Sequence, residues 1–327
     1  MNLFNEVIGH EHIIAHMKNA YQMGKVSHAY ILEGEEGMGK KMLTNCFVKL
    51  LQCENPSGLE PCNTCSSCVQ IDSGNNPDVI YVKPTKKSGY GVGDVREQIV
   101  KDITIKPYKS KYKIYIIDEA DTMTPQAQNS ILKTIEEPPS YGIFFLLATN
   151  SQKFLQTILS RTVKMTLKPV NLNQIESYLL RELGIGTKEA KVFSSFSRGN
   201  LGKALKLQGS ETFTISRNDM LKLLDIFINH KEYDIMDAVK LLDNYKDNIN
   251  EVLEILISLI RDILYYKETK NNDGIIHQDI ESKIIDLSQN TKSLKLVRLV
   301  RNSYLLIGQL RLNVNYSLSV LTMLTDV

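Results

Sequence analysis

The chain has 327 residues, and 39 lysines and arginines against 37 acidic residues give it a formal charge of +2. With 43% hydrophobic and 23% charged residues, its composition is ordinary for a globular protein and excludes a disordered tail, a collagen-like repeat and a disulfide-stapled miniprotein. At roughly 150 residues per domain, the length predicts two or three domains. The longest apolar stretch, Ile143 to Ala148, is far shorter than the about 20 residues that span a membrane, and the N-terminus shows no secretory signal pattern. We therefore expect a cytoplasmic protein, and the near-zero charge makes any DNA contact local or indirect.

The first predicted strand, Ala29 to Glu33, leads into a glycine-rich turn. Gly34-Glu35-Glu36-Gly37-Met38-Gly39-Lys40-Lys41 follows it and opens a helical pattern. All but the last position fit G-x-x-x-x-G-K-[ST], in which backbone N–H groups cradle phosphates and the lysine, here Lys40, reaches the β- and γ-phosphates. The last position needs a hydroxyl ligand for Mg²⁺, whereas Lys41 has only hydrogen-bond donors. We expect nucleotide hydrolysis at this site to be impaired or absent.

Four of the five cysteines follow this helix within a short span. The spacing C-x8-C-x2-C-x2-C relates Cys53, Cys62, Cys65 and Cys68. Each C-x2-C step lets one tight turn aim two thiolates at a common point, and four thiolates form a closed tetrahedral Zn²⁺ site. An iron–sulfur cluster would favour a further Cys-Pro after the run, where this chain has Asp72. We predict a structural zinc ion, with Cys46 as a small buried hydrophobic residue.

Two further strands are predicted at Asp78 to Val82 and at Lys113 to Ile117, both rich in β-branched and aromatic residues. The strand Lys113 to Ile117 is followed by Asp118 and Glu119, at the edge where a parallel sheet places its ligand-binding and catalytic groups. In P-loop proteins the first of these acids orients Mg²⁺ through water and the second polarises the attacking water. The lysines around the start of this strand are interpreted as a solvated face, with DNA phosphate contact as the alternative. They are Lys106, Lys109, Lys111 and Lys113.

The clearest helix is predicted at Pro125 to Glu137, with Thr124 as N-cap and Pro138-Pro139 as the stop. A fourth strand, Ile143 to Thr149, follows it and is apolar almost throughout. Near-continuous apolar strands fit a parallel sheet that is covered on both faces. The alternation of strands and helices therefore predicts an α/β fold.

From about Pro169 onward the sequence pattern is helical. Three short helices are predicted at Asn171 to Leu183, Thr187 to Ser197 and Asn200 to Leu207. The polar stretch Gln208 to Thr214 is interpreted as a linker. Ile215 to Val327 is almost free of glycine and proline and predicts a helical bundle, interrupted by a loop at Lys270 to Gly274.

Taken in chain order, these motifs resemble those of the bacterial clamp-loader AAA+ ATPases. The P-loop and the cysteine quartet are followed by family-like segments at Ile116 to Asp121, Asn129 to Pro139, Leu147 to Asn150 and Ile158 to Thr162. The resemblance implies a RecA-like AAA+ domain over residues 1–167, with the zinc module inserted at 53–68, then a three-helix lid over 168–208 and a helical collar over 209–327. The implied partners are gamma/tau and delta subunits in a five-membered ring, contacted through the collar and the AAA+ faces. The sliding clamp and primer–template DNA are implied as indirect partners.

The resemblance also implies roles for single residues. Val7 and Ile8 match the stretch that walls the adenine pocket in active relatives, and Asn150 falls at the sensor 1 position. Arg161 matches the arginine that reaches across to a neighbouring subunit's ATP. Gly202 stands where motor subunits carry a sensor 2 arginine.

Two functions remain open on this basis. Lys41 and Gly202 favour a non-motor subunit that helps load the sliding clamp on primed DNA and offers Arg161 in trans. Such a subunit would have little or no catalysis of its own, and its binding of ATP and Mg²⁺ is in question. The intact Asp118–Glu119 pair keeps an active gamma/tau-like motor as the alternative. ATP hydrolysis by the purified chain discriminates between them.

Overall fold

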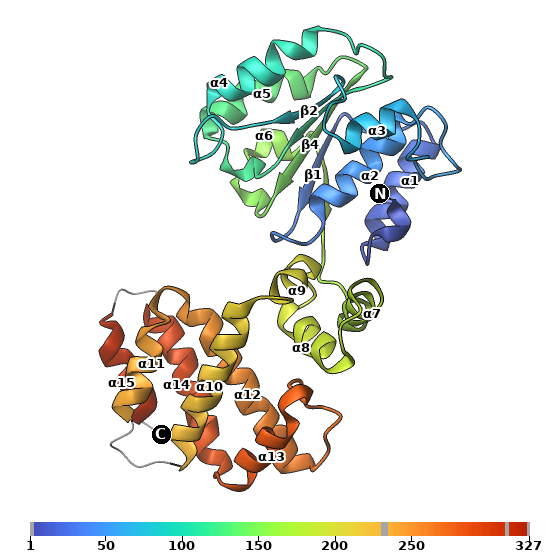
Figure 1. Ribbon diagram of the computed structural model, residues 1–327. Coiled ribbons are helices and arrows are strands. Elements are labelled where there is room, and N and C mark those ends of the chain that lie inside the picture. Colours follow the sequence, from blue (N-terminus) through green and yellow to red (C-terminus); the bar gives the residue numbers. More distant parts are fainter. Residues whose placement is uncertain (1–2, 230–234, 311–313, 326–327) are drawn as a thin grey trace. The chain divides into compact units, whose positions relative to one another are not determined.

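The structure, a computed structural model, describes residues 3–229, 235–310 and 314–325 (Figure 1). The chain divides into one unit of residues 1–175 and 197–203 and a second unit of residues 176–196 and 204–327. A parallel sheet forms the centre of the first unit, whereas the second unit is helical. Within the described ranges, no helix is both long enough and apolar enough to cross a membrane.

The sheet has five strands in the order β2-β3-β4-β1-β5, and every neighbouring pair is parallel. The strands are β1 (Ala29–Glu33), β2 (Val79–Val82), β3 (Lys113–Ile117), β4 (Gly142–Ala148) and β5 (Val163–Thr166). β4 is buried along its whole length, as expected for a central strand covered on both faces. Because β1 and β3 both pair with β4 in parallel, their carboxyl ends lie at the same edge of the sheet.

The α/β prediction is confirmed, and the four predicted strands agree with the structure to within one residue at each end. The sequence analysis missed β5. This edge strand has four residues, of which only Met165 is fully buried. A short strand with polar residues between apolar ones and one open edge lacks the continuous apolar run of β1 and β4.

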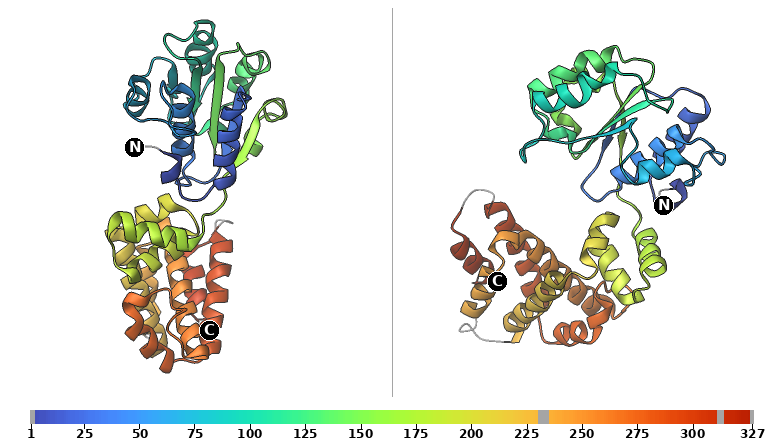
Figure 2. Two further views of the ribbon diagram at one scale, coloured as in Figure 1. Left: turned by 90° about the vertical axis from the view of Figure 1, so that its right-hand side faces the viewer. Right: turned by 45° about the horizontal axis from the view of Figure 1, so that its top comes forward.

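Helices cover both faces of the sheet (Figures 1 and 2). One face carries α1 (Glu11–Gln22), α2 (Lys40–Gln52) and α3 (Ser66–Asp72), and the other carries α4 (Val92–Val95), α5 (Pro125–Glu136) and α6 (Gln156–Leu159). Short 3-10 or π turns connect these elements, namely η1 (Phe4–Glu6), η2 (Arg96–Val100), η3 (Asp102–Thr104), η4 (Ala120–Thr122) and η5 (Ser151–Lys153). The predicted N-cap of α5 is confirmed, because Thr124 Oγ1 accepts the Ala127 N–H at 3.2 Å.

The three short helices predicted after the sheet are confirmed as α7 (Leu172–Leu183), α8 (Thr187–Ser197) and α9 (Leu201–Leu207). The linker predicted at Gln208 to Thr214 is wrong in its second half, because α10 (Glu211–Asn229) already begins there. Ser210 Oγ accepts the Phe213 N–H at 3.2 Å and so caps the first turn of α10. The division into a sheet domain, a lid and a collar stays a prediction.

The remaining described residues form the predicted helical bundle. Its elements after α10 are α11 (Ile235–Asp243), η7 (Lys246–Asn248), α12 (Ile249–Thr269), η8 (Gln278–Ile280), α13 (Glu281–Gln289), α14 (Ser293–Leu310) and α15 (Tyr316–Thr325). α12 buries apolar residues from Val252 to Ile263 at helical spacing, as expected for a helix of the predicted bundle. Lys270, with φ of +54°, ends α12 where the sequence predicts a loop. Parts of the predicted bundle, residues 230–234, 311–313 and 326–327, lie outside the described residues.

Candidate functional site

The turn between β1 and α2 has the backbone conformation of a phosphate-binding loop. Gly37 and Gly39 have φ of +87° and +93°, which L side chains rarely adopt. The Nζ of Lys40 donates to the carbonyl oxygens of Gly34 and Glu35 at 2.5 and 2.9 Å. Burial lowers the pKa of Lys40 below its usual value. No side chain caps the first turn of α2, so its first N–H groups are left for another acceptor.

Lys41 forms an ion pair with the acid that the sequence assigns to magnesium. Its Nζ lies 2.7 Å from Asp118 Oδ2. Both side chains line a cavity of about 490 Å³ together with Gly37, Lys40 and Glu119. The order β3-β4-β1 therefore brings the P-loop and the acidic pair to the same cavity. The Lys41 ammonium pairs with the Asp118 carboxylate and cannot itself ligate a cation, so a magnesium ion at Asp118 would have to displace this ion pair and would lack the hydroxyl ligand of other P-loops.

Three residues that the sequence analysis did not single out also line this cavity: Asp121, Thr149 and Lys153. The buried Asp121 carboxylate accepts the Thr149 hydroxyl at 2.8 Å and the Lys153 ammonium at 3.1 Å. Burial alone would raise the pKa of Asp121, but these hydrogen bonds outweigh burial and lower it. The available signal was the position of Asp121 two residues after the acidic pair.

Val7, Ile8 and Asn150 are not among the described residues that line this cavity. Val7 packs on the apolar core beside β1, and Ile8 is half-buried. The Asn150 side-chain oxygen accepts the Gln152 N–H at 2.9 Å and caps η5. Their roles beside an adenine or a phosphate stay predictions.

Gly202 contacts the P-loop through its backbone. Its N–H donates to the Gly37 carbonyl at 3.0 Å, and the Asn200 side-chain amide donates to the Glu36 carbonyl at 2.8 Å. A Cβ at Gly202 would lie 2.5 Å from the Gly37 Cα, which is closer than real contacts allow. An arginine side chain therefore does not fit at this position unless the P-loop moves.

Arg161 lies just after α6 and is not among the residues described as lining the P-loop cavity. Its guanidinium donates to the Thr157 carbonyl at 3.0 Å and to Ser160 Oγ at 3.1 Å, and it pairs with Glu136 at 3.2 Å. The Arg161 side chain remains 40% exposed. It is thus held by α5 and α6 while part of it stays accessible to another molecule.

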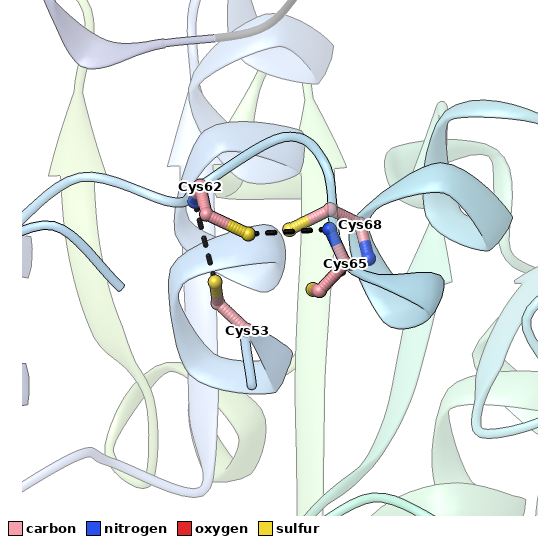
Figure 3. A group of neighbouring side chains, drawn as sticks. All are labelled: Cys53, Cys62, Cys65 and Cys68. Carbon is pink, nitrogen blue, oxygen red and sulfur yellow. Dashed lines mark hydrogen bonds between the residues drawn. The ribbon is translucent and has the colours of Figure 1, made fainter. Parts of the chain in front are cut away.

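The four predicted metal ligands lie together where α2 ends and α3 begins (Figure 3). The Sγ atoms of Cys53, Cys62, Cys65 and Cys68 all lie within 4.8 Å of one another. Tetrahedral zinc with bonds of about 2.3 Å places its four sulfurs about 3.8 Å apart, so a small inward movement would complete the site. The geometry fits a four-thiolate metal ion.

Hydrogen bonds favour the thiolate form of Cys62, whereas burial raises the pKa of Cys68. The Cys62 N–H donates to Cys53 Sγ and the Cys65 N–H donates to Cys62 Sγ, both at 3.3 Å (Figure 3). Backbone hydrogen bonds from Thr64 and Cys65 lower the pKa of Cys62 to about 6, whereas burial raises the pKa of Cys53. A bound cation favours deprotonation of such thiols. Cys46 lies apart from the quartet and is buried as predicted, which raises its pKa to about 12.

The lysines around the start of β3 do not all form a solvated face. Lys113 is buried and pairs with Asp102 at 2.9 Å, so the prediction is wrong for this residue. Lys109 is more exposed and pairs with Glu54 at 2.7 Å. Lys106 and Lys111 are exposed as predicted.

A parallel sheet with a P-loop after β1, an acidic pair after β3 and helical segments following it defines a P-loop protein of the AAA+ class. Sequence models described as "DNA polymerase III, delta subunit" and "DNA polymerase III, delta subunit, C terminal" match residues 9–171 and 211–327.

Curated relatives agree with this match. The chain is 32% identical over 315 residues to DNA polymerase III subunit gamma of Buchnera aphidicola subsp. Baizongia pistaciae, covering 87% of this chain and 84% of that protein. It is 30% identical over 270 residues to DNA polymerase III subunit delta' of Bacillus subtilis, covering 81% and 80%. It is 29% identical over 322 residues to subunit tau of the same species, covering 91% of this chain but only 56% of that longer protein. The chain belongs to the family of DNA polymerase III clamp-loader subunits.

Proposed function

We propose that this chain is the delta prime subunit of the clamp loader, a non-motor AAA+ partner that helps load the sliding clamp on primed DNA in the cytoplasm. The observation that carries the proposal is the ion pair of 2.7 Å between Lys41 and Asp118. A metal ion normally neutralises charge that develops on the transferring phosphoryl group. With an ammonium on Asp118 in its place, we expect little or no ATP hydrolysis by this chain.

Arg161 is proposed to act on the nucleotide of a neighbouring subunit. A planar guanidinium with five donors suits phosphoryl oxygens, and the side chain is 40% exposed. The Nη1 of Arg161 donates to the Thr157 carbonyl and to Ser160 Oγ, which orients the guanidinium. Arg161 can exchange the Glu136 carboxylate, itself 38% exposed, for a phosphate at small cost because exposed ion pairs contribute about 1 kcal/mol or less.

The partner surfaces are proposed to be the collar and the AAA+ faces, which would meet gamma/tau and delta subunits. Supporting this, α14 exposes large apolar side chains at Leu294, Val297, Tyr304 and Leu305, spaced for one helix face. The cysteine quartet is proposed to hold one structural Zn²⁺ that fixes the 53–68 segment between α2 and α3. The clamp and the primer–template DNA would be reached indirectly.

The test is reconstitution of the loader with Arg161→Ala and Arg161→Lys, followed by DNA-stimulated ATP hydrolysis and clamp loading. An arginine finger contributes on the order of 10³ to 10⁵ in rate at the one site it completes, and a lysine should rescue little of this. Arg181→Ala removes an arginine that is 76% exposed on α7 and serves as the matched control. Wild-type rates with Arg161→Ala would refute the role in trans.

A gamma/tau-like motor is the second candidate, favoured by the 32% identity to a gamma subunit and by the intact Asp118–Glu119 pair. The two candidates differ in what the purified chain does alone. Magnesium-dependent ATP hydrolysis by the isolated chain, at a rate comparable with motor subunits, would replace the first proposal with the second.

A further inference from the structure

Carboxylates and ammonium groups both line the P-loop cavity, and the carboxylates are those of Glu36, Asp118, Glu119 and Asp121. Three ammonium groups line the cavity of about 490 Å³, those of Lys40, Lys41 and Lys153. Lys153 is bonded to the buried Asp121 carboxylate at 3.1 Å. Lys40 bonds two carbonyl oxygens of its own loop, which leaves one of its three N–H groups for another acceptor.

Lys41 has more unused N–H donors than Lys40. Its ammonium gives one hydrogen bond to Asp118 at 2.7 Å, and its side chain is 70% exposed. Two further N–H groups are therefore available beside the uncapped first turn of α2. A magnesium ion held by Asp118 would lie next to this ammonium, where like charges repel.

We infer that this P-loop binds the phosphates of a nucleotide without magnesium, because Lys41 neutralises Asp118 and offers its remaining N–H donors where other P-loops place the metal ion. The inference deepens the proposed non-motor function and rests on it, since both follow from the Lys41–Asp118 pair. The inference concerns nucleotide binding and its dependence on magnesium, whereas the proposed function concerns ATP hydrolysis. A nucleotide bound in this way would have no metal ion to assist cleavage.

Binding of ADP to the full-length chain, measured by titration calorimetry with excess EDTA and again with excess Mg²⁺, tests the inference. We expect wild type to bind ADP in EDTA and to lose about tenfold or more in affinity when Mg²⁺ is added. Lys41→Thr, which restores the hydroxyl ligand, should reverse the sign of the metal effect. Lys40→Ala should lose at least about tenfold in both buffers, as expected for one charged hydrogen bond to phosphate.

Lys188→Thr makes the same substitution as Lys41→Thr at an exposed position on α8 and should behave as wild type. Circular dichroism verifies that each variant is folded, and Lys41→Gln provides a second variant that removes the charge without adding a metal ligand. Wild-type binding that requires Mg²⁺, or failure of wild type to bind ADP in either buffer, overturns the inference. Failure to bind ADP leaves the proposed subunit role standing, whereas hydrolysis by the isolated chain would overturn that role instead.

Discussion

Lowering the pH is expected to destabilise the second unit through one buried histidine. The His277 ring is fully buried, with Nε2 3.2 Å from Ser258 Oγ and its centroid 5.5 Å from that of Phe196. Burial, with a smaller effect of the Arg217 and Arg261 guanidinium groups, lowers the pKa of His277 to about 3. In the unfolded chain the pKa of a histidine is about 6.5.

The sign of the effect follows from proton binding. Between pH 6.5 and pH 3 the unfolded chain binds a proton at His277 that the folded chain does not bind. The free energy of unfolding therefore falls as the pH falls through this window. With these two pKa values, the loss between pH 7 and pH 5 is about 2 kcal/mol, whereas above pH 7 the residue contributes almost no pH dependence.

Amide hydrogen exchange in peptides from α12 provides the assay, with rates corrected for the intrinsic effect of pH. A loss of about 2 kcal/mol corresponds to about thirtyfold less protection at pH 5 than at pH 7. His277→Gln removes the titrating group but keeps a polar partner for Ser258, so its protection should change much less between the two pH values. His16→Gln, at an exposed position on α1, is the control and should match wild type. An equal loss of protection in wild type and His277→Gln would refute this reasoning.

Three further predictions concern single contacts. Metal analysis is expected to find one Zn²⁺ per chain, and Cys65→Ser should abolish this zinc and lower the melting temperature. Cys46→Ala is the control and should keep the zinc. A wild-type protein without zinc would refute the predicted metal site. Asp78→Asn should lower the free energy of unfolding by about 2 kcal/mol, because the Asp78 carboxylate accepts hydrogen bonds from the N–H groups of Tyr108, Lys109 and Ser110. Urea unfolding measures this change, and an unchanged unfolding midpoint would contradict the prediction. Glu136→Gln should change the rate of ATP hydrolysis by the reconstituted loader by less than about fivefold, because exposed ion pairs contribute about 1 kcal/mol or less. A loss as large as that of Arg161→Ala would show that Glu136 has a role of its own.

The parts of the fold that could be predicted have local signals. The strands Ala29–Glu33 and Lys113–Ile117 are continuous β-rich runs, and the structure begins and ends them at the predicted residues. Thr124 marks the start of α5 because a side-chain oxygen followed by proline suits a first helical turn. The cysteine cluster is similarly local, because two C-x2-C steps bring three of its four sulfurs together within a few residues.

The parts that could not be predicted depend on pairing between distant segments. β5 is a strand because Tyr30 of β1 stands opposite Val163 in the register, and nothing in its own four residues requires that partner. In the sequence, Lys41 only means that a magnesium ligand is missing. Its ion pair with Asp118 arises from the sheet order, which places the end of β3 beside the P-loop.

Lys41 and Gly202 both depart from the motor pattern, and both contact groups of the same P-loop site. Lys41 neutralises Asp118 without a metal ion, and Gly202 allows its backbone to donate to the Gly37 carbonyl. An arginine at position 202 would collide with Gly37, because its Cβ would lie 2.5 Å from the Gly37 Cα. A threonine at position 41 would restore a magnesium ligand but leave the sensor arginine absent. If the chain is the proposed non-motor subunit, restoring hydrolysis would therefore require both substitutions together with a shift of the P-loop. Arg161 contacts none of these groups, so the proposed contribution in trans does not depend on whether the chain's own site binds magnesium.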